Sequence, residues 1–216
     1  MVTRRLHRLL GVALVAPFLA WTATGLLFLV KPGWRGAYES LDAFRDEAFD
    51  PMGLAPFSIV SAKPGEPGAA VRVEMGTTGL GLVYRVHGSD GTRLVDARTG
   101  SVISPLDRDA ATKVAVDATS RARAVERYGA VRESREDGDT IEVAFEGGAV
   151  VRVGRSDLSL AQSGADTSRI DLLYRLHYLQ WTGVAAIDRP LALAAIGGTW
   201  ILAALGLRLF RKRPDA

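Results

Sequence analysis

The chain has 216 residues, of which 48% are hydrophobic, so it is long enough for one ordinary domain together with membrane helices. It contains no cysteine, which excludes disulfides, thiolate metal sites, iron–sulfur clusters and the attachment of c-type haem. The net charge is +3, and since each end of the chain carries +3, the middle carries −3, which argues against a nucleic-acid partner.

The first predicted element is a membrane-spanning helix over residues 9–30, which contain no ionisable side chain. At about 1.5 Å of rise per residue, a helix of this length crosses a hydrocarbon core of about 30 Å. Arg4, Arg5 and Arg8 precede the apolar run. Because Lys and Arg beside a membrane helix favour the cytoplasmic side, residues 1–30 are predicted to be a cytoplasmic basic head and a first transmembrane helix.

The alternative interpretation of this segment is a cleaved signal peptide, which also combines a charged head with an apolar run. The run here exceeds the about 7–15 residues typical of signal peptides, and the bulky Trp21 makes residues 20–23 a poor cleavage site. A retained helix is therefore favoured. Ala16, Ala20 and Thr24 form a stripe of small residues at which another helix could pack closely, or they reflect only the abundance of alanine.

Residues 31–165 are predicted to form an α+β domain outside the cytoplasm. Trp34, Tyr38 and Leu41 recur at helical spacing and indicate a short amphipathic helix at the membrane surface. Apolar and charged residues then alternate, as half-buried strands require, with glycine-rich turns between the strands and at residues 63–68. The expected strands cover residues 71–73, 84–87, 93–96, 101–104, 130–135, 140–146, 149–154 and 158–161.

One long helix is predicted between the two groups of strands. It should begin after Pro105 with Asp107 as its N-cap and end at Gly129. Its apolar stripe is narrow enough to pack on a sheet and consists of Ala111, Val114, Ala115, Ala118, Ala122 and Val125. Similar strand-turn-strand segments on both sides of this helix indicate a weakly repeated unit, with helices packed on antiparallel sheets.

The last part of the chain predicts a second connection to the membrane. Residues 166–189 form an expected interfacial juxtamembrane helix and turn, because this helical stretch is rich in aromatic residues and directly precedes an apolar span. Residues 190–216 are predicted to be the second transmembrane helix and a basic cytoplasmic tail. The predicted topology therefore has both termini in the cytoplasm and residues 31–189 outside it.

These segments carry a resemblance to a known family. Residues 5–11, which include His7, and residues 176–181, which lead into the second span, resemble the two helix signatures of the PepSY-associated transmembrane proteins. Residues 84–91 and 95–102 resemble the strand pair and the Asp-x-x-Thr-Gly turn of PepSY domains. The chain is similar to the small two-helix members and departs from the four-helix members in having a single helix pair.

The resemblance implies two alternative functions at the bacterial cytoplasmic membrane. Larger membrane relatives include ferric-siderophore reductases, which implies transmembrane electron transfer through haem b to an external acceptor such as ferric iron. PepSY domains of peptidase propeptides imply instead a non-enzymatic binding or inhibitory module acting on an envelope partner such as a peptidase. The lipid bilayer is an expected partner in both cases.

Three histidines are the candidates for metal or proton chemistry. The resemblance makes His7 and His177 candidate haem ligands, although His7 could also bond lipid headgroups at the cytoplasmic face. A helix of about twenty residues would separate them by nearly 30 Å, so two haems, each held by two copies of one histidine, would require a homodimer. His87 shares strand parity with Arg85 and is predicted to face solvent. No nucleophile or carboxylate pair with catalytic spacing indicates a hydrolase.

Overall fold

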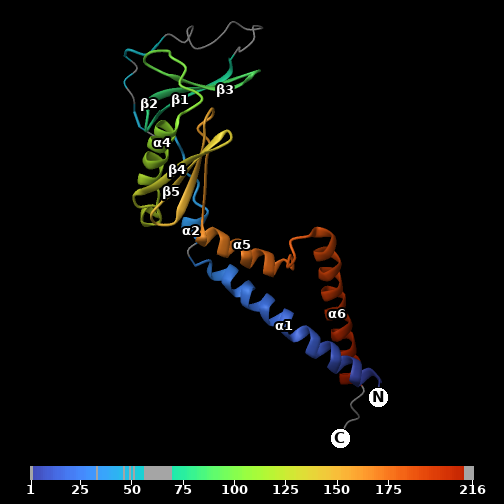
Figure 1. Ribbon diagram of the computed structural model, residues 1–216. Helices are drawn as coiled ribbons and strands as arrows, with labels where there is room; N and C mark the ends of the chain where they lie inside the picture. The colour runs from blue at the N-terminus through green and yellow to red at the C-terminus, as the bar shows by residue number, and fades with distance from the viewer. Residues whose placement is uncertain are drawn as a thin grey trace. The chain divides into compact units, whose positions relative to one another are not determined.

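The computed structural model describes residues 2–32, 34–45, 47–48, 50, 52–55 and 70–211. It divides into a helical unit, Met1–Pro32 with Ser168–Ala216, and a sheet unit, Gly33–Thr167 (Figure 1). The predicted turn at residues 63–68 and the end of the basic tail lie outside the described residues.

The sheet unit is α+β, as predicted, and contains two antiparallel sheets separated in sequence by one helix (Figure 1). The three-stranded sheet has the order β1-β2-β3 and the four-stranded sheet the order β4-β5-β6-β7. The elements of this unit are α2 (Trp34–Ala37), β1 (Ala70–Thr78), β2 (Gly81–Gly88), β3 (Gly91–Asp96), α4 (Arg108–Ser120), η1 (Val125–Arg127), β4 (Val131–Asp137), β5 (Thr140–Phe145), β6 (Ala149–Gly154) and β7 (Leu160–Gly164).

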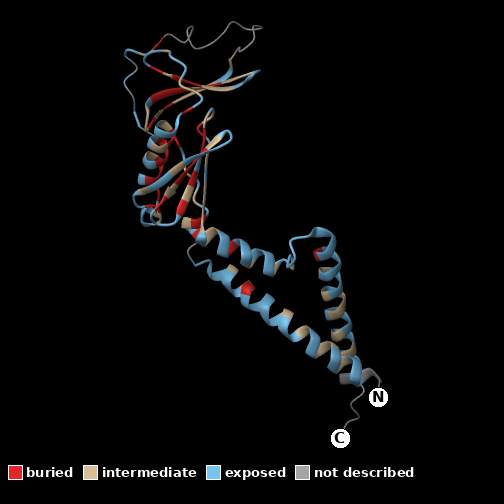
Figure 2. Ribbon diagram, viewed as in Figure 1, coloured by how far each residue is buried: buried red, intermediate tan, exposed pale blue. Residues whose placement is uncertain are grey.

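The core of this unit follows from the alternation of its strands. Alternate residues of β5 and β6 are apolar and buried, because successive side chains of a strand point to opposite faces. The apolar stripe of α4 packs on this face, and Val83 and Leu94 of the three-stranded sheet join the same cluster. Figure 2 shows the buried residues gathered on the facing sides of α4 and the sheets. Helix α4 therefore supplies part of a core shared by both sheets.

Helix α4 begins as predicted, since the side chain of Asp107 accepts a hydrogen bond from the backbone of Ala110 at 2.7 Å. Its predicted end at Gly129 is wrong, because the helix stops at Ser120. The carboxylate of Glu39 accepts a bond from the backbone N–H of Arg123 at 2.7 Å, which satisfies a donor beyond the helix end. The chain then makes a short 3₁₀ turn before β4.

Two other local predictions are also wrong. The amphipathic helix expected from Trp34 onward is only the four-residue α2, in which Trp34 and Ala37 are buried in the sheet unit. Residues 101–104 do not form a strand and make a single bridge, between Val102 and Val95. The other predicted strands are present, the one at residues 149–154 with its predicted bounds and the rest with shifted ends, and β7 starts two residues later than expected.

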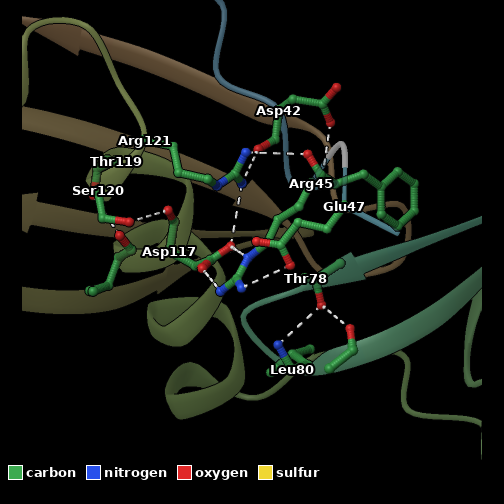
Figure 3. A network of polar contacts seen from close by, with 12 residues as sticks. Asp42, Arg45, Glu47, Thr78, Leu80, Asp117, Thr119, Ser120 and Arg121 are labelled. Atoms are coloured by element: carbon green, nitrogen blue, oxygen red, sulfur yellow. Dashed lines mark hydrogen bonds and ion pairs between the residues drawn. The ribbon is translucent and has the colours of Figure 1, made fainter. Parts of the chain in front are cut away.

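A polar network ties the segment before the first sheet to α4 (Figure 3). Arg45 pairs with the carboxylate of Asp117, with Nε donating at 3.2 Å and Nη2 in a closer contact. Arg121 donates to the same carboxylate at 3.3 Å and to the carbonyl oxygen of Asp42 at 2.9 Å. These bonds hold residues 42–45 against the C-terminal half of α4.

The helical unit contains two helices that are long and apolar enough to span a membrane, α1 (Val2–Val30) and α6 (Ala185–Arg211). Most of their described residues are exposed, including large apolar side chains, and Thr24 is the one buried residue of α1 among those whose burial is described (Figure 2). Exposed apolar surface of this extent is typical of membrane contact. Helix α6 begins five residues before the predicted start of the span at residue 190.

Helix α1 contacts a different helix along each of its halves. Near its N-terminus it crosses α6 at glycines, since a Cβ added at Gly206 would lie 3.3 Å from Cε1 of His7 and one at Gly198 would lie 3.5 Å from Leu14. Its C-terminal half lies beside α5 (Ala165–His177), where the rings of Phe28 and Tyr174 are 4.8 Å apart. A cavity lies in the region between these contacts.

Candidate functional site in the helical unit

A cavity of about 410 Å³ lies within the helical unit, between α1, the end of α5 and α6. Pockets for small molecules commonly measure about 300–1,000 Å³ and are mostly apolar with a few polar groups. The lining residues are Leu14, Pro17, Phe18, Trp21, His177, Tyr178, Leu179, Ala192, Ala195, Ile196, Thr199 and Trp200. Among them, His177 is the one residue with a ring nitrogen that can carry a free lone pair.

The imidazole of His177 is held by two aromatic rings of α1 and by that of Tyr178, the residue after α5. It stacks on Trp21, with 5.5 Å between ring centroids and 8° between planes. Phe28 meets it edge-on at 4.6 Å and Tyr178 at 5.4 Å. His177 is the last residue of α5, and Leu179, at a φ of 57°, reverses the chain beyond it. The ring is therefore held at the end of α5, directly before the turn that leads to α6.

One nitrogen of this ring is bonded to α1. Nδ1 of His177 lies 3.1 Å from Oγ1 of Thr24, whose residue is only 5% exposed. The sequence placed Thr24 on a stripe available to another helix, but α5 of the same chain covers it. No local pattern could have revealed this pair, because its members are 153 residues apart. Nε2 of His177 has no hydrogen-bond partner among the described residues.

The turn between α5 and α6 is held by one buried carboxylate. Asp188 is 5% exposed and accepts bonds at 2.9 Å from the backbone and hydroxyl of Thr182 and from the backbone of Gly183. The turn predicted within residues 166–189 therefore lies before residue 185, where α6 begins. This arrangement fixes Leu179 and the start of α6 on two sides of the cavity.

His7 lies at the other end of α1 and is not brought to His177. From residue 7 to residue 24 the helix rises by about 26 Å, at about 1.5 Å per residue. His7 packs at Gly206, and its Nδ1 is buried without a hydrogen-bond partner among the described residues. The two predicted haem ligands therefore differ in the hydrogen bonding of their Nδ1 atoms: that of His177 is bonded to Thr24, and that of His7 has no partner among the described residues.

His87 belongs to the sheet unit, on the strand face of Arg85, as predicted from its parity. Its Nδ1 lies 3.0 Å from Oγ1 of Thr92, and its Nε2 lies 3.8 Å from the carboxylate of Glu74. Hydrogen bonds from Arg85 are the largest effect on that carboxylate and lower the pKa of Glu74. The side chain of His87 is 34% exposed, so it faces solvent only in part. It is not among the residues that line the cavity.

A second polar cluster, which the sequence did not predict, lies where the chain enters and leaves the sheet unit. Arg127, whose side chain is 10% exposed, donates to the carboxylate of Asp166 at 2.6 and 2.7 Å and to the hydroxyl of Thr167 at 3.1 Å. It also contacts Gln162, whose amide donates to the carbonyl oxygen of Gly36 at 3.2 Å. The cluster therefore joins the segment that follows α1 to the start of α5.

No group of three or more His, Cys, Asp or Glu side chains that could hold a metal ion occurs among the described residues. Comparison of the chain with protein-family models, with curated proteins and with solved structures finds no match.

Proposed function

We propose that the chain is a two-pass protein of the bacterial cytoplasmic membrane that displays a PepSY-like domain outside the cytoplasm and binds haem b for transmembrane electron transfer to an external acceptor such as ferric iron. The observation that carries this proposal is the position of His177. Thr24 holds one of its ring nitrogens, the other has no hydrogen-bond partner in the part of the chain that the structure describes, and the ring borders an apolar cavity.

The proposal assigns separate tasks to the residues around the cavity. His177 would bind the iron through Nε2, and Thr24 would keep the imidazole in place through Nδ1. Trp21 and Trp200, which line the cavity, would help to exclude water from it. Haem iron supplies one-electron oxidation and reduction, and an apolar, water-poor site tunes its potential.

A second copy of the chain would complete the site, because the cavity offers a single imidazole. Ala16 and Ala20 of α1 and Ala203 of α6 are exposed, so small-residue surface remains for a second pair of helices. Under the same scheme the two copies of His7 would hold a second haem at the cytoplasmic end of α1. His7 would need a partner for its buried Nδ1 in that assembly.

A visible absorption spectrum of the full-length protein in detergent tests the proposal. We expect a Soret band with the low-spin form that two nitrogen ligands give, about half of it lost in His177→Ala and about half in His7→Ala. His87→Ala is the control and should leave the spectrum unchanged, since His87 lies in the sheet unit. Absence of a Soret band after haem supplementation, or full haem content in the His7→Ala, His177→Ala double variant, would refute the proposal.

The second candidate function is the non-enzymatic binding or inhibitory module. The observation that favours it is the face of the four-stranded sheet opposite α4, where the side chains of Arg135 and Arg152 are 68% and 50% exposed and flank Glu142. Hydrogen bonds from Arg135 and then Arg152 lower the pKa of Glu142, so this face carries fixed charges near neutral pH. A haem-free protein would leave this function as the better account.

A further inference from the structure

The threonine hydroxyls of the membrane helices share one bonding pattern. Thr22 donates to the carbonyl oxygen four residues earlier at 2.8 Å, and Thr199 of α6 does the same at 2.9 Å. Thr24 lies 2.8 Å from the carbonyl oxygen of Ala20 and 2.9 Å from that of Trp21. This back-bonding is the usual behaviour of Thr inside a helix. The hydroxyl hydrogen of Thr24 is therefore directed at its own helix.

A hydroxyl has one hydrogen and two lone pairs, so Thr24 can meet a further group only as an acceptor. The further group is Nδ1 of His177, at 3.1 Å. A neutral imidazole carries its proton on one nitrogen and a lone pair on the other. If Thr24 accepts, the proton is on Nδ1 and the lone pair is on Nε2.

We infer that Thr24 is a positioning residue that holds His177 in the Nδ1–H tautomer, so that the lone pair of Nε2 is available to a ligand in the cavity. Histidines that bind metals almost always donate their other ring N–H to a neighbouring group, which fixes both the tautomer and the ring. Haem as the ligand rests on the proposed function. The tautomer does not, because it is a property of the protein without ligand.

The tautomer can be measured in the ligand-free, full-length protein in detergent micelles with ¹⁵N-labelled histidine, at a pH where the imidazole is neutral. Two-bond correlation spectra identify the protonated ring nitrogen, and the His177→Ala variant assigns the signal. We expect a proton on Nδ1 in the wild type and in Thr24→Ser, which keeps the hydroxyl. Thr24→Val keeps the shape without the acceptor and should shift the population towards the Nε2–H form.

Thr22→Val is the matched control, because Thr22 makes the same back-bond on the same helix and is exposed. It should leave the His177 signal unchanged. A wild-type spectrum with the proton on Nε2 would overturn the inference, since Thr24 would then donate to the imidazole. An unchanged tautomer in Thr24→Val would show that another group fixes the ring, and would equally overturn it.

A haem titration of the wild type, Thr24→Ser, Thr24→Val and Thr22→Val separates this inference from the proposed function. Loss of a side chain that orients a ligating histidine typically weakens metal binding by about 10–100-fold. We expect a loss in that range for Thr24→Val and none for Thr24→Ser or Thr22→Val. Equal haem affinity of Thr24→Val and wild type would refute the positioning role. No haem uptake by any of them would refute the proposed function, while the tautomer measurement would still decide the inference.

Discussion

The substitution Arg127→Met tests how the two connections of the sheet unit are held. It removes the guanidinium that bonds Asp166, Thr167 and Gln162 while keeping a similar apolar stem. Breaking a buried ion pair costs about 3–5 kcal/mol, most of it because one charge is left buried. The side chain of Asp166 is 40% exposed and can be rehydrated, so we expect a smaller loss of about 2–3 kcal/mol, in the range of bonds to charged groups.

For a domain of this size, one kcal/mol corresponds to about 3–5 °C in melting temperature, so Arg127→Met should melt about 6–15 °C lower. The measurement is scanning calorimetry of the full-length protein in detergent, following the transition of the sheet unit. Arg132→Met is the control, because it removes the same charge from an exposed position of β4, and it should change stability by less than about 0.5 kcal/mol.

The same pair predicts a dependence on pH. Hydrogen bonds from Arg127 are the largest effect on Asp166 and lower its pKa from the ordinary 3.8. A lowered carboxyl pKa gives stability that is present above the unfolded value and lost as the pH falls through the folded value. The difference between wild type and Arg127→Met should therefore be constant near neutral pH and shrink below about pH 4. A difference that persists unchanged in acid, or a variant as stable as Arg132→Met, would refute the reasoning.

Two further predictions concern topology and packing. A reporter fused at Ser104 should be active only outside the cytoplasm and one fused after Arg213 only inside, whereas a mature chain beginning near Thr24 would establish the signal-peptide alternative. Gly79→Ala should destabilise the sheet unit by about 1–3 kcal/mol in the same calorimetric assay. The reason is that the new Cβ would lie 2.5 Å from the carbonyl oxygen of Lys113 and force α4 away. Unchanged stability would contradict that close approach.

The sequence predicted the elements whose signals are local. Alternation located most of the strands, and Asp107 marked the start of α4, because a cap and a period-two pattern are properties of a few neighbouring residues. The end of α4 had no such local signal, and the residue that accepts the hydrogen bond of the backbone N–H of Arg123 beyond it is Glu39, which lies far away in sequence. Of the apolar residues that indicated a helix from Trp34, Trp34 is buried whereas Tyr38 is 48% exposed, so their spacing did not mark a single buried face.

The site was predictable only in part. His177 could be singled out because its segment resembles a known signature, but no pattern in the sequence pairs it with Thr24. The cavity depends on where α5 stops and how the following turn is capped by Asp188. The cluster around Arg127 depends likewise on side chains brought together by three separate segments. Contacts of this kind leave no periodic pattern in the sequence from which they could be predicted.

The difference between the two histidines decides what the haem experiment can reveal. Electron transfer across the whole bilayer needs a centre at each end of α1, and the about 26 Å of helix between residues 7 and 24 is too long for one site to serve both. His177 has the fixed ring that a ligand requires, whereas Nδ1 of His7 is buried without a partner in the described chain. The spectrum of His7→Ala is therefore more informative than that of His177→Ala. Loss of about half of the absorbance would indicate two centres and a transmembrane path, whereas full absorbance would restrict the chemistry to one site beside α5.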